Sequence, residues 1–372
     1  MMSARHWARV LTTACSLVLL VACGGATTSA GQAGAGSSAA ALGGAAAAKQ
    51  LTSLYQQARN AGETQVIVYA PDAPALKVVY DAFSKRFPEI KVQAQLLTGS
   101  QLVTRIDEEF VSGKHTADLL DVPGDEIWRS YAHGYLVPYD PPTAQGLRNT
   151  GYQMVGPDHA WTTPYAKLNG ILYNTDLVKS SQAPKSYAAL LQPQWRGKVV
   201  ITDPRQIGAT SGLLIELVHY GLVSDDFVQR FRAQNPVVVP HVPQVAQLVG
   251  GGEYPLAIPY GVQSVIQDRQ QGAPEGLVLS LKEGAEIAHS PVGLLKGAPH
   301  PHAARLLEAW MLTPEGQRAL ATAGFYGTMP GSPSPAGFPS LSSVKVIPEP
   351  QPDEYDNILN AEITNVARLW GA

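Results

Sequence analysis

Hydrophobic and polar positions along the body of the chain follow the periodicities of strands and helices in turn. The run QVIVY at 65–69 predicts a buried strand, and apolar residues spaced three and four apart at 75–87 predict an amphipathic helix after it. A second strand is predicted at 90–97, a second helix from Thr98, and a third strand at 117–122. This order favours a parallel sheet whose strands are joined by crossover helices. Later strands are predicted at 170–174, 198–202, 254–258 and 277–281, and helices at 301–312 and 314–323.

The N-terminal residues lack this alternation and have the pattern of an export signal. Arg5 and Arg9 precede an apolar stretch at 10–21 that is too short to cross a membrane. The string LVAC, which ends at Cys23, matches the lipobox of bacterial lipoproteins, and this resemblance implies cleavage before Cys23 and lipidation of its sulfur. An ordinary secretory signal with a chance cysteine is the alternative. We expect a signal peptide at 1–22, a flexible tether at 23–48, and an extracytoplasmic chain that is lipid-anchored to the cell membrane, in the periplasm or at the cell surface.

Charge and cysteine content narrow the class of protein. The formal net charge of −3 argues against nucleic acid or an anionic membrane surface as the main partner. Of the two cysteines, Cys15 would leave with the signal peptide, so a mature chain would keep only Cys23. This excludes a disulfide, a cysteine metal site and a free-thiol nucleophile. The remaining body is longer than one hydrophobic core usually serves, which predicts two lobes.

Several stretches of the body resemble one known family. They are 134–142 (GYLVPYDPP), 170–178 (GILYNTDLV), 184–208 (PKSYAALLQPQWRGKVVITDPRQIG), 251–258 (GGEYPLAI) and 296–321 (KGAPHPHAARLLEAWMLTPEGQRALA). Together they are similar to the family-1 extracellular solute-binding proteins of ABC importers, in the branch that includes ferric-ion-binding proteins. The resemblance implies a periplasmic-binding-protein type II fold of class α/β, with two lobes, a ligand cleft between them and a strand hinge.

The same resemblance implies a division of the chain and a set of partners. A monomer without a cofactor would close around its solute and deliver it to an ABC permease in the membrane. The expected segments are lobe 1 at 49–165, lobe 2 at 166–284, a return to lobe 1 at 285–330, and a Pro-rich connection with a C-terminal helix on lobe 2 at 331–372.

The stretch DPRQIGATSG at 203–212 joins a predicted strand to a predicted helix and is the main candidate for an anion site. Free amides at a helix start, a hydroxyl and a small glycine suit a phosphate, phosphonate or carboxylate, which points to Thr210, Ser211 and Gly212. Arg205 is near enough in sequence to add a guanidinium fork. Ferric-binding proteins, which this region resembles, hold an anion at a Ser-Gly here. The alternative is a plain N-cap, which stabilises a helix by ~1 kcal/mol.

Further candidates lie near strand ends that should face the cleft. One pair opens the second predicted helix, one pair follows the first strand, one precedes the crossing between lobes, and one follows the strand at 254–258. Each pair has an ordinary role as cap, turn or packing residue as its alternative. In the same order, the four pairs are Ser100 and Gln101, Tyr69 and Asp72, Tyr165 and Lys167, and Tyr260 and Gln263.

The sequence departs from the ferric-binding pattern at the metal ligands. The paired tyrosines of those proteins align with Val262 and Gln263, and their histidine aligns with Ala73. Fe(III) prefers phenolate and carboxylate oxygens, so we expect no metal and a small organic anion as the solute. A ferric receptor that uses other ligands is the alternative. His300 and His302 are expected to cap a helix rather than bind metal.

The catalytic motifs GxSxG, HExxH and Walker A are missing from the sequence, so an enzyme is the least expected class. A sensory binding protein that presents its ligand to a membrane kinase is a third class. The residues do not separate sensing from transport.

Overall fold

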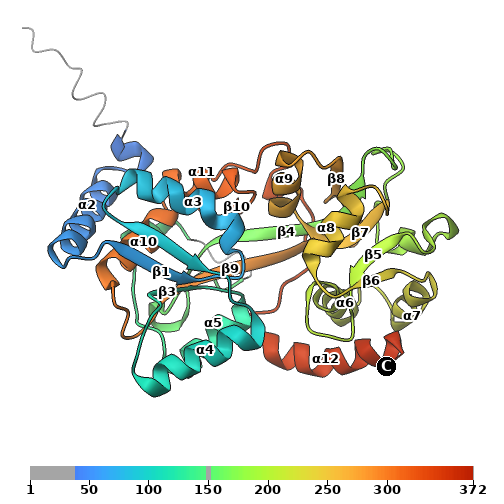
Figure 1. Cartoon of the computed structure of the whole chain (residues 1–372), viewed down its shortest axis with the longest axis horizontal. Coiled ribbons are helices and arrows are strands. Elements are labelled where there is room, and N and C mark those ends of the chain that lie inside the picture. Colours follow the sequence, from blue (N-terminus) through green and yellow to red (C-terminus); the bar gives the residue numbers. More distant parts are fainter. Residues whose placement is uncertain (1–37, 148–151, 372) are drawn as a thin grey trace, which may run out of the picture.

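Two lobes lie side by side and are joined by long strands that run from one to the other (Figure 1). The computed structural model describes residues 38–147 and 152–371. The predicted signal peptide and Cys23 lie outside the described residues. The long strands are β4 (Thr162–Asn174) and β9 (Glu286–Leu294), and the strand order through the sheet is β2-β1-β3-β9-β4-β7-β5-β6. The expected α/β class with two lobes and a strand hinge is confirmed.

Lobe 1 contains the alternating strands and helices that the hydrophobic pattern predicts. Strand β1 pairs in parallel with both β2 and β3, and β3 pairs with β9 in antiparallel register. The predicted first strand matches β1 residue for residue. The elements are β1 (Gln65–Tyr69), α3 (Ala73–Arg86), β2 (Lys91–Gln95), α4 (Gly99–Ser112), β3 (Leu119–Asp121), α5 (Gly124–Ala132), α10 (Pro301–Met311), α11 (Pro314–Thr322) and β10 (Tyr326–Gly327).

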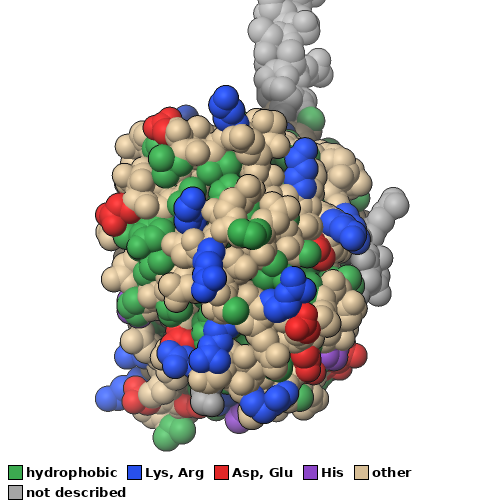
Figure 2. All heavy atoms as spheres, turned by 90° about the vertical axis from the view of Figure 1, so that its right-hand side faces the viewer, with side chains coloured by type: hydrophobic (Ala, Val, Ile, Leu, Met, Phe, Trp, Pro, Cys, Tyr) green, Lys and Arg blue, Asp and Glu red, His purple; other side chains and the backbone are tan. Residues whose placement is uncertain are grey.

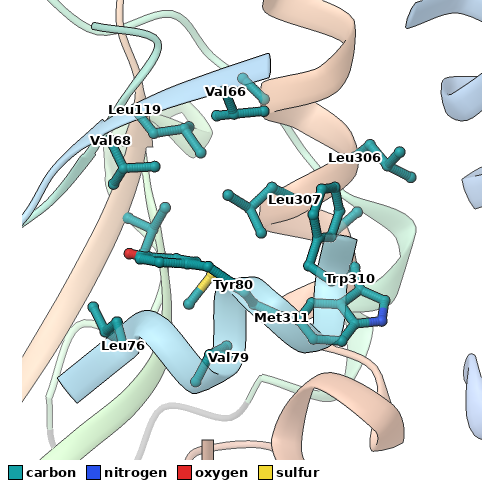
Figure 3. Close-up of a cluster of buried hydrophobic side chains, with 14 of the residues drawn as sticks. Val66, Val68, Leu76, Val79, Tyr80, Leu119, Leu306, Leu307, Trp310 and Met311 are labelled. Atoms are coloured by element: carbon teal, nitrogen blue, oxygen red, sulfur yellow. The ribbon is translucent and has the colours of Figure 1, made fainter. Parts of the chain in front are cut away.

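The core of lobe 1 is formed where α3 and α10 pack on the sheet (Figure 3). Leu76, Val79 and Tyr80 of α3 face the apolar side chains of α10, and the strands contribute Val66 and Val68. These α3 residues recur three and four positions apart, so one helix face is buried. Burying each aliphatic side chain stabilises the fold by about 1.5–3 kcal/mol.

The tether was expected to end at residue 48, and the structure corrects this boundary. Helix α2 (Ala45–Asn60) already begins at Ala45, and residues 38–41 are helical as well. Leu42 is only 7% exposed and joins the lobe 1 core together with Leu51. An alanine-rich segment has high helix propensity, and one well-placed leucine is enough to attach it to a neighbouring apolar surface.

Lobe 2 places its helices on both faces of the second half of the sheet. Ile201 and Ile258 face the core under α6, α7 and α12, whereas Val200 and Ala257 face α8 and α9. Helix α12 contacts α6 and α7. The elements are β5 (Val199–Thr202), α6 (Ala209–His219), α7 (Asp225–Ala233), β6 (Val237–Val239), α8 (Val242–Gly250), β7 (Leu256–Gly261), α9 (Val262–Gln270), β8 (Glu275–Val278) and α12 (Tyr355–Trp370).

The hinge consists of three crossing segments. Strands β4 and β9 pair in antiparallel register from Asn169↔Glu286 to Thr162↔Val292. Residues 345–347 run beside Ala285, the residue that precedes β9, where the Ala285 amide donates to the Lys345 carbonyl at 2.9 Å and the Ile347 amide donates to the Ala285 carbonyl at 2.8 Å. The lobes are therefore connected by hydrogen-bonded strands rather than by a loose linker.

The hydrophobic pattern predicted only part of this hinge. Strand β4 begins at Thr162 instead of 170, and β9 was not predicted. The β9 sequence EIAHSPVGL mixes polar residues with apolar ones and contains Pro291, so it has no clear strand pattern. Among the described helices, none is both long and apolar enough to cross a membrane.

Trp310 tests how much stability the lobe 1 core provides. The side chain is fully buried and meets Phe83 edge-on, with 5.6 Å between ring centroids. We expect Trp310→Ala to lower the free energy of unfolding by about 3–5 kcal/mol, because it removes a large aromatic group and leaves a cavity. Urea unfolding followed by circular dichroism measures the loss. Val111→Ala is the control, since Val111 is 88% exposed, and an equal loss in both variants would contradict this assignment of the core.

Candidate functional site

Strand β4 places a row of polar side chains at the junction of the lobes, and each binds an acidic residue. The Tyr165 hydroxyl donates to Asp121 at 2.7 Å, and the Lys167 ammonium donates to Asp72 at 2.8 Å. Two residues further, the Asn169 amide donates to Glu286 at 3.0 Å. Alternate residues of a strand point to the same side, so residues 165, 167 and 169 share one face. Lobe 1 and both hinge strands therefore meet at this row.

The start of α6 lies against the same junction. The Ser211 hydroxyl accepts from the Gly208 amide at 2.9 Å, and the Thr210 hydroxyl accepts from the Thr202 amide at 3.0 Å. Both hydroxyls thus hold the turn of their own chain. A Cβ added at Gly212 would lie 3.9 Å from the Glu286 Oε1 atom, so this glycine faces the hinge strand. Any anion bound here would depend on the amides of the helix start.

Arg205 already has an anionic partner. Its guanidinium forms two hydrogen bonds to Asp203, Nε to Oδ1 at 2.9 Å and Nη2 to Oδ2 at 2.8 Å. Hydrogen bonding to Arg205 lowers the pKa of Asp203, so the pair is ionised near neutral pH. Half of the Arg205 side chain is exposed. Arg205 would have to leave this fork before it could bind a solute.

The candidate pair at the start of α4 is exposed, and its helix end has a partner from the same chain. The Gly99 amide donates to the Glu126 carboxylate at 3.1 Å. Ser100 and Gln101 extend into solvent beside it. A carboxylate of α5 therefore occupies the position that an anionic solute would take.

Two predicted tyrosines face away from the junction, which removes them from the candidate site. Tyr69 is buried, and its hydroxyl bonds to Glu109 and Arg105 of α4. Tyr260 is buried in lobe 2, and its hydroxyl donates to Asp268 of α9. Tyr69 is the last residue of β1 and Tyr260 is the last but one of β7, and each side chain points into the helix layer on one face of the sheet rather than beyond the strand end.

Gln263 lies where α9 meets lobe 1. A Cβ added at Gly324 would be only 2.5 Å from the Gln263 Cα atom, so the two lobes are in direct contact here. The Gln263 side chain is 8% exposed, and its Oε1 atom is buried and has no hydrogen-bond partner among the described residues. The junction therefore brings together Asp72, Tyr165, Lys167, Gly212 and Gln263 of the predicted set.

Buried carboxylates are the feature of this junction that the sequence did not predict. Burial raises the pKa of Asp121 to about 7 and that of Glu286 to about 7, and it raises the pKa of Glu126 to about 8. Burial lowers the pKa of Lys167, but Asp72, with smaller contributions from Asp121 and Glu286, raises it above its usual value overall. The sequence signal was an aspartate inside the apolar run ADLLDV at 117–122, since buried strands seldom contain an unpaired charge.

The outer surface has a different charge balance. Figure 2 shows lysine and arginine side chains scattered over the outer end of lobe 2, with fewer acidic groups in view. The charged groups buried at the junction include Asp121 and Glu286, and Lys167 beside them is a half-buried cation. The electrostatic character of the site therefore cannot be read from the net charge of the chain.

A metal site is not formed by the side chains that the structure places. In residues 38–147 and 152–371, no group of three or more His, Cys, Asp or Glu side chains is arranged to hold a metal ion. His300 and His302 pair with different carboxylates, Asp118 at 3.0 Å and Glu63 at 2.7 Å. Those carboxylates also accept hydrogen bonds from the backbone amides of His300 and His302, so this cluster caps the start of α10.

Two lobes with helix starts directed at a strand-hinged junction define a binding protein of the periplasmic type II class. The family model described as bacterial extracellular solute-binding protein matches residues 79–340, and the chain belongs to that family. Its members are solute-binding proteins of ABC-type import rather than enzymes, and they act outside the cytoplasm.

Solved structures support the fold assignment. The iron-bound HitA of Pseudomonas aeruginosa is 20% identical, with a TM-score of 0.65 over 83% of this chain and 100% of that chain. AfuA of Actinobacillus pleuropneumoniae, solved with fructose-6-phosphate, is 17% identical, with a TM-score of 0.65 over 81% and 98%. Ferric ion-binding protein A of Pasteurella haemolytica is 18% identical, with a TM-score of 0.62 over 82% and 98%. At these identities the likeness establishes the fold, and the solute has to be inferred from the site.

Asp121 gives the junction a pH dependence of stability. Its pKa rises from 3.8 to about 7 on burial, beside Tyr80, Tyr165, Asp72 and Lys167. The native state therefore binds a proton more tightly than the unfolded state, and this contribution to stability is lost as pH rises from about 4 to about 7. We expect the loss to reach about 4 kcal/mol at most.

Asp121→Asn tests this prediction. The amide keeps an oxygen for Tyr165 but does not ionise, so its free energy of unfolding should fall less steeply between pH 4 and 7 than that of the wild type. Urea titrations at several pH values measure both slopes. Asp203→Asn is the control, and its effect on the pH slope of stability should have the opposite sign, because Arg205 lowers the folded-state pKa of Asp203. Parallel curves for wild type and Asp121→Asn would contradict the assignment.

Proposed function

We propose that the protein is a lipid-anchored receptor that closes around a small organic solute with an anionic group and delivers it to an ABC permease. The observation that carries the proposal is the start of α6, which lies at the lobe junction with Gly212 facing the hinge. At the helix start the amides of Gly208, Thr210 and Gly212 already donate within the chain, so among the described residues the amides of Ala209 and Ser211 are left for a solute. Lys167, whose side chain is 16% exposed, is a cation in the same region. A phosphate ester, a phosphonate or a carboxylate has the charge for this position.

The carboxylates of the junction favour a solute that also carries an amino group or another hydrogen-bond donor. Asp121 and Glu286 are buried there, Glu126 is half-buried, and Lys167 is already paired with Asp72. A purely anionic solute would push Glu286, whose pKa is already raised to about 7, further toward its protonated form, whereas the cationic group of a zwitterion would stabilise the ionised carboxylate while its anionic group binds at the start of α6. A zwitterionic solute is therefore our second candidate.

Iron is the main competing cargo, because HitA is iron-bound and the Pasteurella haemolytica protein is a ferric-ion-binding protein by name. The residues that would replace the phenolate pair here are Val262 and Gln263, neither of which offers an anionic oxygen. A thermal-shift panel of phosphate esters, phosphonates, carboxylates, amino acids and Fe(III) separates the candidates. A ligand at a hundredfold excess over its Kd should stabilise the protein by ~2.7 kcal/mol. A shift with Fe(III) alone would overturn the proposal.

Gly212→Asp tests the contribution of the α6 start. A side chain fits at this position without a clash, so the new carboxylate would compete with the solute for the amides and repel its anionic group. We expect the affinity for the solute identified in the panel to fall at least tenfold, as measured by isothermal titration calorimetry. Gly212→Asn has nearly the same shape without the charge and should lose much less. Equal losses in the two variants would show that size, and not an anion at α6, explains the effect.

The lipid anchor is part of the proposal and rests on the lipobox that ends at Cys23. A thioether-linked diacylglycerol would keep the receptor at the membrane next to its permease. We expect Cys23→Ser to move the protein from the membrane fraction to the soluble fraction and to remove the lipid mass from the intact chain, as detected by fractionation and mass spectrometry. Cys15→Ser is the control, because Cys15 lies inside the predicted signal peptide. Unchanged fractionation of the Cys23 variant would contradict a lipoprotein.

The remaining parts of the proposal concern organisation and role. We propose that the lobes divide near residues 165, 284 and 330, the first two of which fall within β4 and just before β9. We also propose a monomer, which light scattering of the purified chain checks. Uptake of labelled solute by cells distinguishes import from sensing. If the receptor serves transport, deletion of the permease should abolish this uptake.

A further inference from the structure

A pocket of about 650 Å³ lies in lobe 2, at the end of the sheet away from the lobe junction. Its walls come from residues just after the end of β4, just before β5 and just before β7. Strand β5 begins beside the pocket, and its other end leads into the turn before α6, which faces the hinge. We call this pocket the outer pocket. It and the solute junction lie at opposite ends of the lobe 2 sheet.

Apolar side chains give the outer pocket part of its wall. Leu177 is 52% exposed and lines it together with Pro255. Trp195 belongs to the lobe 2 core and is only 7% exposed. Because Trp195 lines the pocket, the small part of its side chain that solvent reaches lies there. The wall therefore offers apolar surface to a ligand without being wholly apolar.

Two aromatic residues also bring accessible donors to the outer pocket. The Nε1 atoms of Trp161 and Trp310 are sealed in the core without a partner, whereas that of Trp195 is not sealed. The Tyr254 side chain is half-buried, and its hydroxyl is not sealed either. Neither the Trp195 N–H nor the Tyr254 hydroxyl forms a hydrogen bond with another described residue. Both groups are therefore free to bind a ligand oxygen.

The remaining polar groups of the outer pocket are exposed and balanced in charge. Gln182 and Gln194 contribute amides, each of which can both donate and accept hydrogen bonds. The charged lining residues are Lys198 and Glu253, one of each sign. An ion would be attracted by one of them and repelled by the other, so the pocket gives no net preference to either charge.

We propose that the outer pocket is a second binding site, for a neutral saccharide of one or two rings. A sugar ring has C–H groups that can pack on the apolar wall and hydroxyls that both donate to and accept from amide groups. The volume is in the range of small-molecule sites, and polar groups set beside apolar and aromatic walls are typical of them. A purely apolar molecule would leave the amides and the free donors without partners.

The outer pocket is formed by lobe 2 alone, since its lining residues fall between 177 and 255. Rotation of the lobes about the hinge therefore leaves its walls in place, and its ligand does not compete with the solute at the junction. The site goes beyond the proposed function and does not depend on the identity of the cargo. The saccharide is either free in solution or the accessible end of a polysaccharide chain.

Cellobiose, maltose and chitobiose are the probes, because they are neutral disaccharides that differ in linkage and in ring substituents. The full chain is kept in a detergent without a sugar headgroup, so that the detergent does not compete. In ligand-observed NMR titrations we expect at least one probe to bind saturably with a Kd of about 10 mM or tighter. Sedimentation with cellulose, starch or chitin then separates the two sources, since only a site for polysaccharide ends is retained by the matching polymer. Failure of all three probes to bind saturably would overturn the proposal.

Substitutions in the outer pocket locate the binding. Gln182→Ala should weaken the affinity for the bound probe about threefold, because it removes hydrogen bonds of an exposed side chain. Trp195→Phe should have a similar effect, because it keeps an aromatic ring and removes the N–H donor. Gln244→Ala is the matched control, since Gln244 is an exposed glutamine of lobe 2 outside the pocket. Unchanged affinity in both pocket variants, or an equal loss in Gln244→Ala, would overturn the site.

Two further variants test the separation from the junction and the neutral class of ligand. Gly212→Asp should leave saccharide binding unchanged, and a loss of binding in this variant would place the saccharide at the solute junction instead. The double variant Lys198→Gln with Glu253→Gln should keep most of the affinity, because its amides still form hydrogen bonds. A tenfold loss in the double variant would show that ion pairs hold the ligand and would overturn the neutral class.

Discussion

The antiparallel pairing of β4 with β9 is the interaction on which the rest of the structure depends. Its backbone hydrogen bonds tie two separate cores together, and the residues at 345–347 add a third crossing segment beside Ala285, just before β9. Successive side chains of these strands alternate between two faces. One face carries the polar row that meets Asp72, Asp121 and Glu286, and on the other face Ile287 and His289 line a cavity of about 580 Å³. A change in the geometry of β4 and β9 would therefore move side chains on both faces of the hinge.

Buried charge gives the solute junction its character. Asp121 and Glu286 lose their hydration when the lobes and the hinge surround them, and the Tyr165 hydroxyl and Asn169 amide compensate only in part. Lys167 keeps its charge because Asp72 is 2.8 Å away. A helix start that favours anions thus lies beside carboxylates that favour cations. Under the proposed function, this combination is the reason why a zwitterionic solute is the second candidate.

The sequence was informative where one local pattern was sufficient. The run at 65–69 and the helices that begin at Pro301 and Pro314 were predicted closely, because an apolar run or an N-terminal proline acts within a few residues. Strand β9 was missed because it is stabilised on both sides by neighbours that are distant in sequence. Tyr69 and Tyr260 lie near the predicted strand ends, but their side chains pack under α4 and α9, because the face that a strand residue takes depends on its register in the sheet, which the sequence does not give.

The sequence by itself determined the family resemblance, the succession of strands and helices, and the helix start at 209–212, because these depend on residue types close together in the chain. Only the tertiary structure decided which of those residues meet. It paired Lys167 with Asp72 across 95 positions and Asn169 with Glu286 across 117. It also turned Leu42 of the expected tether into a core residue. The physical reason is that burial and charge pairing depend on distances in space, which the spacing along a chain does not contain.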